Sequence, residues 1–76
     1  MDPSLIAFVA CADQYSELQA LLAAAATPQA ILDLAAGRGF AVEWDALRQA
    51  SRELSAPYWP WAAKGTSWRR QFFAGA

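Results

Sequence analysis

Apolar side chains recur along this chain at the spacing of one face of an α-helix. Leu5, Phe8, Val9 and Ala12 stand at positions i, i+3, i+4 and i+7, and a second stripe of the same spacing begins at Leu18. Such stripes predict helices that are buried along one face. The pattern breaks between the two stripes, at residues 13–16, so the second one is either a separate helix or a kinked continuation of the first.

Capping residues mark where the first and third elements begin. Asp2 precedes Pro3, and Thr27 precedes Pro28. A side-chain oxygen at the N-cap accepts from a free backbone N–H, and proline is well tolerated at the next position. We therefore predict helix starts at both places, with Gly37 or Gly39 ending the helix that follows Thr27.

One more helix is expected before the composition changes. It begins near Glu43, carries Leu47, Ala50 and Leu54 on its apolar face, and ends before Pro57. The high alanine and leucine content and the scarcity of β-branched residues agree with helices throughout. The predicted fold is all-α, a bundle of three to four short helices over residues 1–56 followed by an aromatic-rich C-terminal arm over residues 57–76.

The arm differs from the body in both aromatic content and charge. Three of the four tryptophans lie in it, and its three cations, Lys64, Arg69 and Arg70, meet no acid, whereas residues 1–55 carry seven acids and three arginines. Trp, Tyr and Arg are the residue types most enriched at binding hot spots. The candidate partner-binding residues are Tyr58, Trp59, Trp61, Trp68, Arg69, Arg70, Phe72 and Phe73.

A second interpretation of the arm is structural. In a chain of 76 residues the core is small. The aromatic rings of the arm would enlarge it if they folded back on the body. The sequence leaves both interpretations open, and a turn of helix placing Trp68 and Phe72 at i, i+4 is compatible with either.

Several chemistries are excluded by what the chain lacks. It has no histidine and one cysteine, Cys11, so neither a histidine-based nucleophile nor a thiolate zinc site can be assembled. We expect a non-enzymatic protein with no cofactor and no metal. The lone cysteine also favours a reducing, cytoplasmic compartment, and no apolar run approaches the roughly 20 residues of a membrane span.

Residues 4–54 resemble the Nif-eleven family of small helical domains, which are widespread in cyanobacteria and also serve as leader regions of modified peptides. The residues that carry the resemblance are Phe8, Leu18, Leu22, Ile31, Leu34, Ala35, Gly39, Phe40 and Leu47. The resemblance implies a helical domain that is recognised by another protein. In precursors of this kind a double-glycine-type site ends the leader, and Gly75-Ala76 looks similar to such a site.

Two functional hypotheses follow. The first is an adaptor or regulatory subunit that docks on a larger protein complex through the C-terminal arm. The alternative is a leader-type recognition domain for a peptide-modifying enzyme or an exporting protease, with contacts on the body around Phe8, Leu18 and Leu22. In both hypotheses the partner is a protein, and self-association is possible. No nucleic acid is expected because the net charge is −1.

Overall fold

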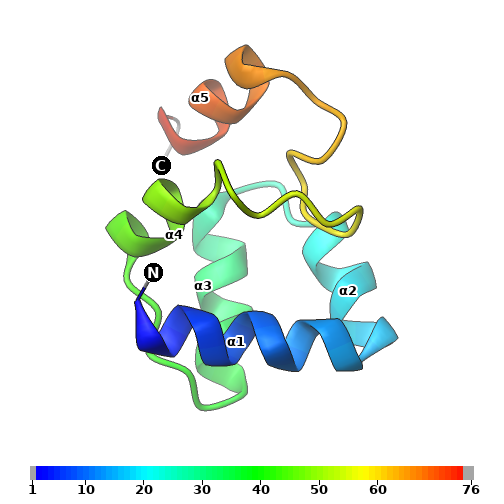
Figure 1. Ribbon diagram of the computed structural model, residues 1–76, viewed down its shortest axis with the longest axis vertical. Helices are drawn as coiled ribbons and strands as arrows, with labels where there is room; N and C mark the ends of the chain where they lie inside the picture. Colours follow the sequence, from blue (N-terminus) through cyan, green and yellow to red (C-terminus); the bar gives the residue numbers. More distant parts are fainter. Residues whose placement is uncertain (1, 75–76) are drawn as a thin grey trace.

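Residues 2–74, which the computed structural model describes, form five α-helices and no strand. The helices are α1 (Pro3–Gln14), α2 (Ser16–Ala23), α3 (Pro28–Gly37), α4 (Trp44–Ala50) and α5 (Thr66–Ala74). Figure 1 shows α1 across the lower part of the view, α2 and α3 beside it, α4 at mid-height, and α5 at the top next to α4. The all-α prediction is confirmed: four helices lie within residues 1–56, as expected, and the fifth, α5, lies in the C-terminal segment.

The predicted caps form the local interactions that were expected of them. The Asp2 carboxylate accepts from the backbone N–H of Leu5 at 3.2 Å, and the Thr27 hydroxyl accepts from the N–H of Ala30 at 3.2 Å. Each bond satisfies one of the donors that an α-helix leaves free at its start. These two helix starts are therefore specified by neighbouring residues in the sequence.

The interruption between the first two apolar stripes is a break between two helices. Tyr15 has extended backbone angles, with φ −121° and ψ 108°, and separates α1 from α2. The side-chain amide of Gln19 donates back to the carbonyl oxygen of Ala12 at 2.9 Å. This bond satisfies a carbonyl in the last turn of α1 and fixes the bend between the two helices.

Gly39, and not Gly37, has the left-handed conformation after α3. Its φ is +88°, and Phe40 N–H donates to the carbonyl oxygen of Ala35 at 2.9 Å across the turn. Gly37 is the last residue of α3 itself. A glycine at this position avoids the steric cost that a Cβ would bring, which explains why the chain reverses here.

Helix α4 is shorter than the sequence predicts. It ends at Ala50, and the chain continues in a turn that carries Leu54 into the core. The C-terminal segment, by contrast, holds more helix than the single turn that was expected, because α5 spans nine residues. Between α4 and α5, the chain makes a series of turns in which Ala63 adopts a φ of +62°.

A single hydrophobic core includes residues from both the expected body and the expected arm. The body supplies most of the aliphatic side chains, and the segment after Pro57 supplies two tryptophans and two phenylalanines. The buried apolar residues are Leu5, Phe8, Ala12, Leu18, Leu22, Ile31, Ala35, Leu47, Ala50, Leu54, Trp59, Trp61, Phe72 and Phe73. Packing therefore does not divide the chain at residue 56.

Candidate functional site

Half of the eight candidate residues of the C-terminal segment are buried, and the other half are accessible to different degrees. Four of them are core residues: Trp59 is 2% exposed, and Trp61, Phe72 and Phe73 are also buried. Tyr58 and Arg69 are half-buried, and Trp68 and Arg70 are exposed. The four buried rings are thus held by the chain's own packing and cannot meet a partner unless the domain opens.

Specific contacts position the buried rings. Trp59 and Trp61 stack almost parallel, with ring centroids 5.3 Å apart and an interplanar angle of 6°. The indole N–H of Trp61 donates to the carbonyl oxygen of Leu54 at 2.6 Å. The ring centroids of Phe73 and Trp61 are 5.6 Å apart, so α5 packs on the core through these stacked tryptophans. The aromatic residues that the sequence offered as binding anchors act here as the packing between α5 and the rest of the domain.

Tyr58 joins the C-terminal segment to the end of α1. Its hydroxyl donates to the Asp13 carboxylate at 2.5 Å, across 45 positions of sequence. Burial is the main factor that raises the pKa of Tyr58 above its usual value, and the hydrogen bond and negative charge of Asp13 add to it. The pair is a structural link, because both groups are engaged with each other.

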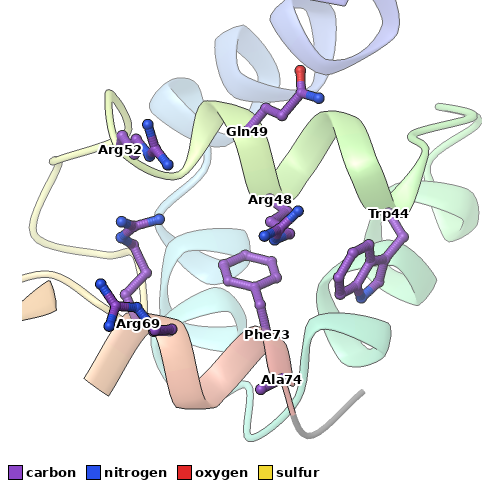
Figure 2. Close-up of a pocket in the computed structure, with 8 residues that line it drawn as sticks. Trp44, Arg48, Gln49, Arg52, Arg69, Phe73 and Ala74 are labelled. Carbon is purple, nitrogen blue, oxygen red and sulfur yellow. The ribbon is translucent and has the colours of Figure 1, made fainter. Parts of the chain in front are cut away.

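The most distinctive surface feature is a groove between α4 and α5, shown in Figure 2. Its volume is about 540 Å³, and side chains of the two helices face each other across it. We call it the arginine groove. Its described lining consists of Trp44, Arg48, Gln49, Arg52, Arg69, Arg70, Phe73 and Ala74.

The charge of the arginine groove is of one sign. Four of the eight described lining residues are arginines, and none is acidic. Arg48 comes from α4 and Arg52 from the turn that follows it, whereas Arg69 and Arg70 come from α5. The tertiary structure thus brings together four guanidinium groups from two distant parts of a chain whose net charge is −1.

Two of these arginines have defined contacts. Arg69 donates through Nη1 to the Ser51 hydroxyl at 2.9 Å, and that hydroxyl donates to the carbonyl oxygen of Arg48 at 2.6 Å. Ser51 is 2% exposed, which makes it the buried polar centre of the α4–α5 contact. The Arg48 guanidinium lies 5.9 Å from the ring centroid of Trp44, within the range of a cation–π interaction.

Aromatic rings form the apolar part of the groove. Trp44 and Phe73 meet edge to face, with centroids 5.8 Å apart and an interplanar angle of 83°. The indole N–H of Trp44 is buried and has no hydrogen-bond partner among the described residues. Such a donor costs about 1–3 kcal/mol relative to a satisfied one.

Sequence reasoning identified Arg69 and Arg70 but missed Trp44, Arg48 and Arg52 as members of a site. A signal was present, because Arg48 and Arg52 stand at i, i+4 outside the apolar face of their helix. Nothing in the sequence, however, indicates that this pair faces the pair on α5.

The leader-type hypothesis places contacts on the body around Phe8, Leu18 and Leu22, and the structure shows which side chains of that region are accessible. Phe8, Leu18 and Leu22 are completely buried, because they form the apolar faces of α1 and α2. The large apolar side chains that those helices expose are Ile6 and Leu21, each 51% exposed, and Tyr15 follows α1 at 46%. These three side chains are therefore the large apolar groups of this region that are accessible in the folded domain.

Two further observations concern the described residues. No group of three potential ligands that could hold a metal ion is found in residues 2–74. None of their helices has the length and apolar character needed to cross a bilayer. The expected processing site at Gly75-Ala76 lies outside the described residues.

Comparison with known proteins identifies a family for this chain. The family model described as Nif11 domain matches residues 3–43, which is more than half of the chain and comprises α1, α2, α3 and the loop that leads into α4. The match ends before Leu47, so it is shorter than the expected range of 4–54. No curated protein and no solved structure matches the chain. The chain therefore belongs to the Nif11 domain family.

Proposed function

We propose that this chain acts as a leader-type recognition domain, bound by a peptide-modifying enzyme or by an exporting protease. The observation that carries the proposal is the family match over residues 3–43, because Nif11 domains are the leader-peptide-like domains of precursor peptides. In this role the chain is a binding partner and not a catalyst. Its helices provide the shape that the enzyme recognises.

The surface of α1 and α2 is our candidate for the contact with that enzyme. Ile6 and Leu21 lie on helices inside the matched range, and each leaves about half of its side chain in water. Covering two such aliphatic side chains supplies favourable transfer free energy, at roughly 25 cal/mol per Å². The core residues beneath them hold the helices in place but do not touch the partner.

The adaptor hypothesis based on the C-terminal arm has less support. Four of its eight contact residues, Trp59, Trp61, Phe72 and Phe73, are buried against the chain's own core. Docking through those rings would require α5 to leave the body and expose them. Only Trp68, Arg69, Arg70 and part of Tyr58 are accessible to a partner of the folded domain.

Binding measurements with defined enzymes test the proposal. The peptide-modifying enzymes and exporting proteases encoded beside this chain's gene are purified and titrated with the chain by isothermal titration calorimetry. We expect one of them to bind, and the double variant Ile6→Ser, Leu21→Ser to bind at least about tenfold more weakly, as expected for two lost apolar contacts. Circular dichroism checks that the variant stays folded.

A matched variant separates this proposal from the adaptor hypothesis. Trp68→Ala removes an exposed apolar side chain from α5, outside the family match. Binding that survives Trp68→Ala and is lost in the α1–α2 variant supports recognition through the body. Binding lost only in Trp68→Ala favours the arm, and the absence of binding to every such enzyme contradicts the proposed function.

A further inference from the structure

The arginine groove lies outside the residues that the family model matches. Its described lining begins at Trp44, whereas the family match ends at residue 43. A function of this groove is therefore independent of the leader-type recognition proposed for α1–α3. We propose that the arginine groove binds an acidic peptide segment of a partner protein, in which aspartate or glutamate side chains alternate with apolar ones.

The charge of the groove selects the sign of the ligand. Arg48, Arg52, Arg69 and Arg70 share one opening of about 540 Å³, and no described lining residue offsets them with a carboxylate. Like charges that line one groove repel each other, and an anion bound there relieves that repulsion. Guanidinium groups also bind carboxylates through paired, parallel hydrogen bonds.

The groove is partly preorganised. The bond from Arg69 to Ser51 restrains one guanidinium, and the Trp44 ring restrains another, that of Arg48. Ser51 is buried and uses its hydroxyl both to accept from Arg69 and to donate to the Arg48 carbonyl, so its own orientation is fixed. A restrained arginine loses less conformational entropy when a ligand binds.

The apolar part of the groove favours a peptide over a bare anion. Trp44 stands among the arginines and is half-buried, so an apolar side chain of the ligand can pack against the accessible part of its ring. A groove of this volume accommodates a few side chains and not a folded domain. A nucleic acid is disfavoured because the chain as a whole has a net charge of −1, which gives no long-range attraction for a polyanion.

A second copy of this chain is a poor source of such a segment. Its acids are dispersed, and the two nearest in sequence, Glu43 and Asp45, flank Trp44, which belongs to the groove itself. No stretch of residues 2–74 therefore offers several carboxylates to a groove on another copy. The ligand chemistry points to a different protein.

Fluorescence anisotropy with peptide probes tests the proposal. The probe is a short fluorescein-labelled peptide of alternating glutamate and leucine, and the comparison probe carries glutamine in place of glutamate. We expect the acidic probe to bind at least about tenfold more tightly, with an affinity that falls as salt is raised. Equal binding of the two probes would overturn the proposal.

Variants place the binding in the groove. Arg48→Gln combined with Arg70→Gln, two exposed positions, should weaken binding of the acidic probe by about tenfold. Arg38→Gln is the matched control, because Arg38 is exposed at the end of α3 and does not line the groove. Arg48→Glu combined with Arg70→Glu leaves two arginines and two glutamates at the four positions, so the groove should lose its preference for the acidic probe over the glutamine probe. Circular dichroism checks that this variant stays folded.

Two further arms identify a different occupant. A fluorescein-labelled oligothymidine that binds more tightly than the acidic peptide would make the groove a nucleic-acid site and overturn the proposal. Sedimentation velocity with the unliganded chain detects self-association, and a dimer that is lost in Arg48→Gln, Arg70→Gln would assign the groove to a second copy instead. A monomer that binds the acidic probe supports the proposal.

Discussion

The indole N–H of Trp61 donates to the backbone carbonyl oxygen of Leu54 at 2.6 Å, and this buried bond ties the C-terminal segment to the turn after α4. Both residues belong to the hydrophobic core. The bond allows the chain to bury a tryptophan with its polar atom satisfied. It therefore stabilises the packing of the aromatic segment against the core of the domain.

Trp61→Phe tests that bond. The change keeps an aromatic ring but leaves the Leu54 carbonyl without its partner in the core, so we expect a loss of about 1–3 kcal/mol in the free energy of unfolding. Urea denaturation followed by circular dichroism measures it. Trp68→Phe, at an exposed tryptophan, is the control and should cost less than about 0.5 kcal/mol. Equal effects of the two changes would show that the bond contributes nothing.

Truncation after Ala56 should abolish cooperative unfolding. The deletion removes Trp59, Trp61, Phe72 and Phe73 from the core. Loss of one buried Phe or Trp costs about 3–5 kcal/mol, and a domain of this size has only about 4–11 kcal/mol in total. Circular dichroism and urea titration give the measurement. A shortened chain that unfolds with an unchanged midpoint would establish residues 57–76 as a detachable arm.

The burial of Tyr58, together with its hydrogen bond to Asp13, predicts a dependence of stability on alkaline pH. The pKa of Tyr58 is raised in the folded state above its ordinary value near 10, so the folded chain retains the phenol proton more firmly than the unfolded chain. This contribution is complete below about pH 10 and is lost as the pH rises toward the raised pKa. Tyr58→Phe should therefore cost about 1 kcal/mol at pH 8 and less at pH 11.

Absorbance titration isolates the same group. The chain contains two tyrosines, so the variant Tyr15→Phe leaves Tyr58 as the single phenol. Its ionisation, followed near 295 nm, should occur well above pH 10 in the folded protein and near pH 10 in concentrated urea. Coincident titrations in the two conditions would contradict both the burial of Tyr58 and its hydrogen bond to Asp13.

Ala63→Gly should stabilise the chain. Ala63 has a φ of +62°, where a side chain with a Cβ is strained by about 1–2 kcal/mol and glycine is not. The larger backbone entropy of glycine in the unfolded state offsets part of this gain, which leaves a net effect of up to about 1 kcal/mol. Thermal unfolding measures it, with Ala62→Gly as the neighbouring control, which should destabilise. A lower melting temperature for Ala63→Gly would argue against the left-handed turn.

Ser51→Ala should weaken binding of the acidic peptide in the arginine groove without removing any charge from it. The variant frees Arg69 from its hydroxyl partner, so this guanidinium has to be ordered again when an acidic peptide binds. We expect the affinity for the acidic probe to fall by about threefold, and stability to fall by about 1 kcal/mol. Ser55→Ala, at an exposed serine in the turns between α4 and α5, is the control. Unchanged affinity in Ser51→Ala would exclude preorganisation by Ser51.

The first three helices were predictable because their determinants are local. Asp2 and Thr27 cap helices through bonds to residues three positions ahead, and the apolar spacing from Leu5 and Leu18 fixes which faces are buried. Phe8, Leu18 and Leu22 were correctly placed as apolar positions of helices, but the same burial removes them as contact residues. A stripe at helical spacing predicts a core more directly than it predicts an interface.

The aromatic segment and the arginine groove depended on contacts between distant parts of the chain. Composition alone describes Trp59, Trp61, Phe72 and Phe73 equally well as binding anchors or as core. Their burial is decided by the turns after α4, which fold α5 back onto the body and also bring Arg69 and Arg70 opposite Arg48 and Arg52. The sequence by itself therefore determined the helical class, the helix caps and the apolar faces, because each of these depends on residues a few positions apart. Only the tertiary structure decided which surfaces pack together, because that depends on how the chain reverses direction between the helices.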